Sequence, residues 1–383
     1  MGDVNITLAN GRLGGTLQTN DGVCGMILTG APEGDYAVGT PILIKSMADL
    51  AAAGITNTGN AFAYRQVKEF YDEAGKGASL YLMLLADTVP LAVMADATIL
   101  IYAQGKIKIL GIMCNDAAVY DEEDFLATTG INDDVHELLT GIKGVADEYF
   151  AAQKPFRAII GGTSFSGTPG DLTDLTTGTT NNRVGVVIGD TKTGRGACLG
   201  MLLGAMAKLP VMRKVSRVRN GQLTNSEAWL SAYQLEAVPD DGAEIAARGY
   251  ITWKTYPNVA GYYFSGDDTA SATTDDYHSL ARGRVIDKVH ILAYTTFVQE
   301  VDDEVFVVEG KLEAGYCKTL SQKIENQINS TMTANKEISS VTCIIDPAQD
   351  IISTNTLNVQ LSIVPVGYST IIDIELGFDN PAQ

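Results

Sequence analysis

The sequence of 383 residues has few of the side chains from which metal and nucleophilic centres are built. Its three histidines are far apart and lack the spacing of metal ligands, so a zinc site or a histidine-based catalytic centre has little to be built from. The five cysteines form no CxxC pair, and each lies within or beside an apolar stretch. We therefore expect buried, reduced thiols, and we assign no catalytic residue, metal ligand or cofactor.

Positive charge and long apolar runs are also scarce. The chain carries 27 lysines and arginines against 46 aspartates and glutamates, for a formal net charge of -19. Affinity for a phosphate backbone comes from basic side chains that displace counterions, so we expect no nucleic-acid partner.

The apolar stretches fall short of the ~18 to 20 residues that cross a bilayer, and the first residues show no basic segment followed by an apolar core. We expect no membrane insertion and a protein made and kept in a cytoplasm.

Apolar residues make up 45% of the chain and charged residues only 19%, which excludes a disordered protein. The length is sufficient for two or three modules, each with a sizeable core. The low charge, together with many threonine, alanine and glycine residues, suggests that part of the surface is buried between subunits.

Strands and helices alternate between residues 20 and 215, and the strands are apolar throughout. Such strands are typical of a mainly parallel sheet that helices cover on both faces. We therefore predict an α/β fold with a mixed sheet core covered by helices. The predicted strands are 22–30, 79–87, 106–114, 156–162 and 183–190, and the predicted helices are 59–75, 133–153 and 197–209.

The pattern changes near residue 275 and predicts an α+β C-terminal domain. Its two long helices are 275–297 and 312–332, and its strands are 337–346, 356–366 and 370–378. Along the second helix every fourth residue is apolar, and four residues advance ~40° beyond a full turn, so this stripe winds around the helix. It either lines a curved packing groove in its own domain or touches a second subunit at one end. The stripe consists of Leu312, Tyr316, Leu320, Ile324, Ile328 and Met332.

Both ends of the chain contain an alternating apolar segment that has no obvious partner. Near the N-terminus, "VNITL" is a lone short strand followed by the flexible lead "ANGRLGG". Near the C-terminus, "TIIDIELGF" is a strand at the edge of the predicted domain. A lone strand needs a sheet elsewhere. The apolar residues that share one face of these two strands are Val4, Ile6, Leu8, Ile372, Ile374 and Leu376.

The stretch "GDTKTGRGACLG", Gly189 to Gly200, joins a strand to a helix and is similar to a phosphate-binding turn. A P-loop requires Lys and Ser or Thr after its second glycine, but Arg195 and Gly196 follow Gly194 here. The dinucleotide fingerprint also fails, because Leu199 occupies its third glycine position. We therefore interpret Gly196, Gly200 and Gly204, which recur every four residues, as packing residues that thin one side of the helix so that it lies close to the sheet. Small residues at this spacing can also serve any other close neighbour.

Basic residues gather in two short segments of this acidic chain. In a protein that assembles with itself, such segments meet the acidic faces of neighbouring subunits. They are equally consistent with ordinary ion pairs inside one chain. The residues that we select from these segments as candidates for contact with a tube or a neighbour are Arg282, Arg284, Lys288, Arg213 and Arg217.

Taken in order, several segments resemble the contractile tail sheath proteins of phages and related injection particles. The opening "DGVCGMILTGAPEG" and "GTPILIKSMADLAAAGI", the aromatic helix "GNAFAYRQVKEFYDEAG", the small-residue helix "ACLGMLLGAMAKLPV" and the helix "DYHSLARGRVIDKVHILAYTTF" all match elements of that family. The segment "FSGDDTAS" departs from the family's pattern, so the chain resembles a divergent member of the Bacteroidetes prophage and injection-system type.

The resemblance implies a non-enzymatic subunit that stacks as rings around an inner tube and contracts to drive that tube through a target membrane. It implies as partners other copies of the chain, the inner tail tube protein, and baseplate and tail terminator proteins. It also implies assembly in the bacterial cytoplasm into a virion tail or a contractile injection particle. In this family the chain termini are arms that add strands to the sheets of neighbouring subunits.

These expectations divide the chain into four parts. They are an N-terminal linking arm, residues 1–20; an α/β core domain, residues 21–215; an α+β domain, residues 216–355; and C-terminal strands forming a second linking arm, residues 356–383. The alternative to a sheath subunit is a soluble α/β enzyme or ligand-binding protein that uses the turn Gly189 to Gly200.

Overall fold

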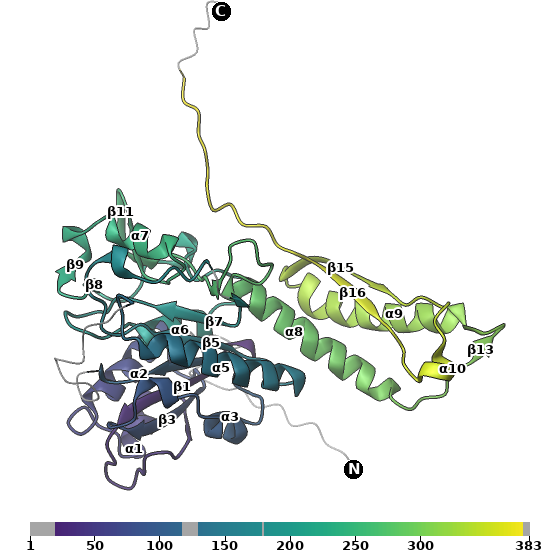
Figure 1. Cartoon of the computed structure of the whole chain (residues 1–383), viewed down its shortest axis with the longest axis horizontal. Helices are drawn as coiled ribbons and strands as arrows, with labels where there is room; N and C mark the ends of the chain where they lie inside the picture. Colours follow the sequence, from purple (N-terminus) through teal and green to yellow (C-terminus); the bar gives the residue numbers. More distant parts are fainter. Residues whose placement is uncertain (1–19, 117–128, 178–179, 378–383) are drawn as a thin grey trace, which may run out of the picture. The chain divides into compact units, whose positions relative to one another are not determined.

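The computed structural model describes residues 20–116, 129–177 and 180–377, and the chain divides into two compact units (Figure 1). The first unit is Met1–Thr295 and the second is Thr296–Gln383. Each unit has its own sheet.

A six-stranded sheet forms the centre of the first unit, in the order β2-β3-β1-β4-β5-β7. All neighbouring strands are parallel except β2, which runs antiparallel to β3. The residues of β1, β4, β5 and β7 are buried along their whole length, as expected for strands that are covered on both faces. The predicted mixed α/β sheet is therefore confirmed. The strands are β1 Cys24–Gly30, β2 Ile42–Ile44, β3 Leu80–Ala86, β4 Ile109–Met113, β5 Arg157–Gly161 and β7 Val184–Val187.

Helices pack on this sheet, α2 and α6 against each other and against its central strands, α3 on β1 and β3, and α5 on β5 and β7. The described helices of the unit are α1 Met47–Ala52, α2 Ala61–Ala74, α3 Thr98–Ala103, α5 Asp134–Ala151, α6 Leu199–Ala207, α7 Asp241–Ala247 and α8 Leu280–Phe297, the last of which ends in the second unit. Short two-residue ladders and one longer hairpin complete it. They are β6 Thr180–Asn181 with β12 Ala270–Ser271, β8 Trp229–Leu230 with β9 Tyr233–Gln234, and β10 Trp253–Tyr256 with β11 Val259–Phe264.

Helix α6 lies unusually close to helix α2. A Cβ atom added at Gly200 would stand 1.9 Å from the carbonyl oxygen of Gln66, and one at Gly204 would stand 2.4 Å from that of Phe70. The prediction that the small residues of this helix face the sheet is therefore wrong for these two glycines, which face a neighbouring helix backbone. The sheet instead supplies its own glycine, Gly111 of β4, where leucines of α6 pack.

Residues 216–295 pack with the first unit, although the sequence analysis places a domain boundary after residue 215. The backbone of Ile251 continues the sheet beside β7, because it bonds to both Val186 and Ile188 at 2.8 Å. Trp253 is buried and stacks on Phe264, with ring centroids 5.5 Å apart. These pairings are distant in sequence, which is why composition along the chain did not reveal them.

Helix α8 is anchored to the sheet by a buried ion pair between Arg157 of β5 and Asp287. The guanidinium group donates to both carboxylate oxygens, at 2.6 and 2.7 Å, and to the carbonyl oxygen of Gly283 at 2.9 Å. A Cβ atom at Gly283 would collide with this guanidinium group at 2.6 Å, so the helix approaches the sheet here only because the residue is glycine. Two buried charges that are fully hydrogen-bonded in this way fix the position of the helix.

The second unit is a helix packed on a two-stranded antiparallel sheet, β15 with β16. Its elements are β13 Val307–Val308, β14 Lys311–Leu312, α9 Ala314–Ile328, a π-helical turn Asn329–Thr333, β15 Ile338–Ile344, α10 Ile351–Thr354 and β16 Gln360–Pro365. This confirms the predicted α+β character of the C-terminal region.

The winding apolar stripe of α9 is accommodated inside this unit. Leu320, Ile324, Ile328 and Met332 are all buried, and both α9 and the π-helical turn pack on β15. In the turn, Ala334 N–H bonds to the carbonyl five residues earlier, so the chain rotates less per residue than in an α-helix. The π-helical turn thus offsets the drift of the four-residue spacing. The packing groove is the alternative that these contacts favour.

The close approach of α6 and α2 predicts the effect of Gly200→Ala. The added methyl group forces the two helices apart, and overpacking of this kind costs about 1–3 kcal/mol. We expect a urea unfolding midpoint below that of the unchanged chain. The control is Gly144→Ala in α5, where an added Cβ meets nothing within 4 Å, so alanine stabilises the exposed helix by about 0.5–1 kcal/mol. Equal stability of the two variants would contradict this account of the packing.

Candidate assembly surfaces

The turn Gly189–Gly200 is filled by side chains of helix α2. Arg65 forms a two-pronged ion pair with Asp190 and a longer contact of 3.4 Å with Glu69. The hydroxyl of Thr191 donates to the same Glu69 oxygen at 2.6 Å. Burial raises the pKa of Glu69, and the Arg65 guanidinium opposes this rise. Arg65 of α2 therefore pairs with the carboxylates of Asp190 and Glu69 at the turn, while Lys192 of the turn itself is exposed.

The beginning of helix α6, where a phosphate-binding turn would present free N–H groups, is also occupied. The amide oxygen of Gln66 accepts a hydrogen bond from the Gly200 N–H at 2.7 Å, and its amide nitrogen donates to the carbonyl of Ala197 at 3.0 Å. Gln66 is completely buried. This arrangement does not favour the alternative of an enzyme or ligand-binding protein that uses this turn.

The five cysteines are all buried and unpaired with one another, as the sequence predicts. Burial raises the pKa of Cys24 to about 12, so its thiolate is scarce at neutral pH. Within the part of the chain that the structure describes, no three His, Cys, Asp or Glu side chains gather where they could hold a metal ion. Nor does any helix of residues 20–116, 129–177 and 180–377 have the length and apolar character needed to span a bilayer.

Two of the five candidate basic residues have partners inside the chain. Arg284 is 4% exposed and donates to the carbonyl oxygens of Asp21, at 3.2 Å, and Leu209, at 3.1 Å. Lys288 forms an ion pair of 2.7 Å with the Asp21 carboxylate. The prediction that these two bases contact a tube or a neighbour is therefore not supported by their surroundings. Sequence reasoning missed Asp21 because it lies 263 residues before Arg284.

The other three bases differ in exposure. Arg217 is exposed, while Arg213 and Arg282 are half-buried. No ion pair joins any of the three to a carboxylate within the described residues. Because Arg284 is buried, the five candidate bases do not form one exposed patch, and contact of the other three with a neighbour stays a prediction.

Residues 370–377 of the predicted strand 370–378 form no strand in the structure, and Phe378 lies outside the described residues. The segment 366–377 follows β16 as a thread without helix or strand, and Figure 1 shows it leaving the hairpin. Ile372, Ile374 and Leu376 are 73%, 74% and 90% exposed. The alternating pattern that indicates a strand is present, but extended backbone forms a ladder only with a neighbour, and residues 370–377 have none among the described residues.

The two edges of the β15–β16 sheet differ. The Cys343 N–H of β15 donates to the Glu325 carboxylate of α9 at 2.7 Å and so points away from β16. Because Cys343 lies opposite Leu361, and hydrogen-bonded and non-bonded pairs alternate in an antiparallel ladder, the backbone groups of Leu361 and Ile363 point outward from β16. Glu325 thus occupies the outward N–H of Cys343 on β15, whereas no partner bonds the outward backbone groups of Leu361 and Ile363 on β16 within the described chain.

The N-terminal strand residues Val4, Ile6 and Leu8 lie outside the described residues. The turn Asn20–Gly22 is the first described element, and the contacts of Asp21 with α8 hold it in place. Neither the capped edge of β15 nor the open edge of β16 was found from the sequence, because a side chain that covers a strand edge leaves no periodic signal.

Solved structures with the same architecture are subunits of contractile sheaths. The helical sheath of the anti-feeding prophage in its contracted state aligns with a TM-score of 0.63 at 15% identity, over 98% of this chain and 99% of that one. The contracted sheath complex of PVC, an extracellular contractile injection system, aligns with a TM-score of 0.59 at 13% identity, covering 99% and 98%. The sheath tail protein of Listeria innocua aligns at 0.51 and 9% identity, covering 90% and 95%. The chain therefore has the fold of contractile sheath subunits.

The sequence of the chain also matches two family models. The model described as DUF2586, N-terminal domain matches residues 1–268, and that of the DUF2586 C-terminal domain matches residues 276–383. The chain belongs to this family. No curated protein matches it in sequence.

Proposed function

We propose that this chain is the structural subunit of a contractile sheath, which stacks as rings around an inner tube and contracts to drive the tube through a target membrane. The observation that carries the proposal is the fold, which aligns over 98% of the chain with a sheath subunit. The apolar thread after β16 and the open edge of β16 support it, because both are incomplete in a single copy.

The partners follow from this role. Further copies of the chain form the rings, the inner tail tube protein lies inside them, and baseplate and tail terminator proteins close the two ends. Assembly takes place in the bacterial cytoplasm, and the product is a virion tail or a contractile injection particle. The protein has no enzymatic role in this account, since movement comes from a change between two packings of the same subunits, of which the extended one is metastable.

The predicted linking arms are residues 1–20 and 356–383, but residues 360–365 of the second form β16 and pair with β15 of the same chain, so the part that links copies in this proposal begins after β16. In this proposal the C-terminal thread of one copy adds to the sheet of a neighbour, and the neighbour supplies the hydrogen bonds that the thread lacks. The alternating residues Ile372, Ile374 and Leu376 then become buried on one face. Arg213, Arg217 and Arg282 are the bases that remain for contact with the tube or with adjacent copies.

Negative-stain microscopy of the purified full-length protein tests the proposed function. Sleeves or stacked rings are the expected result, because a sheath subunit has self-complementary surfaces. The contrary result is a monodisperse globule whose melting temperature rises when a nucleotide is added, which would support a ligand-binding protein instead.

The C-terminal arm is tested by changing Ile372, Ile374 and Leu376 together to serine. These side chains are exposed in the single chain, so the unfolding free energy should change by less than about 0.5 kcal/mol, while ordered polymers are lost. The matched control changes Asp373 and Glu375 to serine and should leave polymers intact. Removal of residues 1–12 examines the other arm in the same assay. Ordered tubes from the triple variant would refute the arm assignment.

A further inference from the structure

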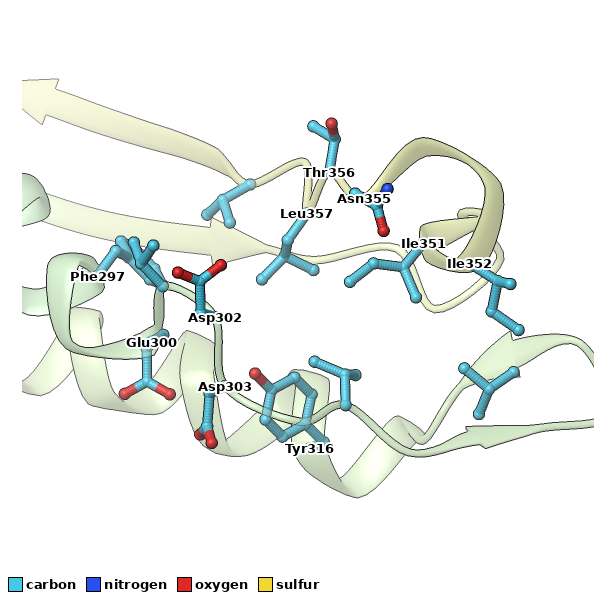
Figure 2. A pocket seen from close by; sticks show the side chains of 14 residues that line it. Phe297, Glu300, Asp302, Asp303, Tyr316, Ile351, Ile352, Asn355, Thr356 and Leu357 are labelled. Atoms are coloured by element: carbon cyan, nitrogen blue, oxygen red, sulfur yellow. The ribbon is translucent and has the colours of Figure 1, made fainter.

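The second unit contains a cavity of about 770 Å³ that the sheath assignment does not explain. It lies between the end of α8 with the loop that follows, one turn of α9, and the segment around α10 (Figure 2). In the figure, Leu357 and Ile351 extend from the α10 side toward the loop that carries Asp302 and toward Tyr316, while the carboxylate of Asp303 lies on the other side of this loop. The cavity is therefore a hollow with walls from three separate parts of the unit.

The lining combines an apolar floor with acidic groups. Phe297, Tyr316 and Leu357 are among its large side chains, and Asp302 and Asp303 stand at its side. Burial raises the pKa of Tyr316, and nearby carboxylates add to the rise, as expected in a negative potential. No basic side chain pairs with Asp302 or Asp303 in the described chain, although the third acidic lining residue, Glu300, pairs with Lys323.

A ligand that fits this lining has an apolar tip flanked by positive charge. The C-terminal thread does not qualify, because Asp373 and Glu375 would meet like charges. The bases of the second unit are four lysines, of which Lys323 already pairs with Glu300, and residues 296–383 contain no arginine. A planar guanidinium group can pair with a carboxylate through two hydrogen bonds, which an ammonium group cannot, so an apolar tip flanked by two arginines can come only from residues before 296 or from another protein.

The first unit carries a small basic knob of this kind, residues 214–221. At its tip Val218 is 38% exposed between the exposed Arg217 and Arg219. Its backbone is held by hydrogen bonds from Asn220 Nδ2 to the Lys214 carbonyl, at 3.0 Å, and from Gly221 N–H to the Val218 carbonyl, at 3.1 Å. Because the knob is already folded, little conformational entropy is lost when it docks.

We propose that the knob of one copy docks into the acidic cavity of a second copy. Val218 contacts the apolar floor, and Arg217 and Arg219 pair with Asp302 and Asp303. The contact joins the first unit of one subunit to the second unit of another. It rests on the proposed assembly of many copies, and it names a surface separate from the terminal arms.

Two charge variants test this contact, one on each side. In the knob variant, Arg217 and Arg219 are changed to glutamate. In the cavity variant, Asp303→Lys is combined with Asp302→Asn, because asparagine tolerates the left-handed backbone of Asp302 at φ 63°. Each variant alone should need an about tenfold higher concentration to assemble, as followed by light scattering, since each meets the wild-type charge of its own partner surface. Circular dichroism checks that both are folded.

Mixing the two variants separates a contact between copies from one within a chain. In the mixture, the glutamate knob of the knob variant meets the lysine cavity of the cavity variant. The unchanged knob of the cavity variant meets the unchanged cavity of the knob variant. Alternating copies should therefore assemble at near wild-type concentration. A contact within one chain gains nothing from mixing. The control for the knob variant is Lys76→Glu with Lys106→Glu. It changes the net charge by the same amount as the knob variant, at two exposed sites outside the knob, and should assemble normally.

The outcomes distinguish this contact from the function on which it rests. Unimpaired assembly of either variant alone, or impaired variants that mixing does not restore, overturns the docking of the knob and leaves the sheath assignment standing. A wild-type chain that forms no assemblies at any concentration removes the sheath assignment and this contact together.

Discussion

Extended backbone forms a ladder only with a neighbouring strand, and residues 370–377 of the C-terminal thread have no such neighbour among the described residues. Three of the large apolar side chains in this segment, Ile372, Ile374 and Leu376, are exposed to solvent. The neighbouring hairpin is incomplete in the complementary sense, because β16 has an open edge while Glu325 caps β15. One unit thus contains both an alternating apolar segment that joins no sheet of the described chain and a sheet edge that no strand covers, and this pair of features supports the proposed assembly.

The central sheet of the first unit, by contrast, has no long open edge among the described residues. It ends on one side at the short strand β2 and is continued on the other by Ile251, so neither edge offers a long open ladder. Gly200 lets α6 lie on the backbone of α2, and the Arg157–Asp287 ion pair fixes α8 to the sheet. A rigid block joined to an incomplete hairpin suits a lattice whose subunits move as bodies while their links persist.

The alternation of apolar strands and helices was enough to predict the α/β sheet and the two C-terminal helices, because hydrophobic periodicity is a local property. Contacts between residues distant in the sequence could not be predicted from this periodicity. The turn at Gly189 is filled by Gln66, which lies 134 residues before Gly200, and Lys288 pairs with Asp21, which lies 267 residues before it. The strand 370–378 was predicted from the alternation of apolar and polar residues, but this alternation does not say which sheet a strand will join. The open edge of β16 follows only from the register of the hairpin.

Hydrogen–deuterium exchange of the single chain and of assembled tubes tests most directly whether the thread pairs between copies. Exchange reports hydrogen bonds of individual amides, and unpaired backbone exchanges freely. Residues 371–377 should exchange at the rate of unstructured peptide in the single chain and about a hundredfold or more slowly in the tubes, together with Leu361 and Ile363 of β16. Rapid exchange of these amides in well-ordered tubes would contradict the account, because the thread would then remain unpaired in the assembly.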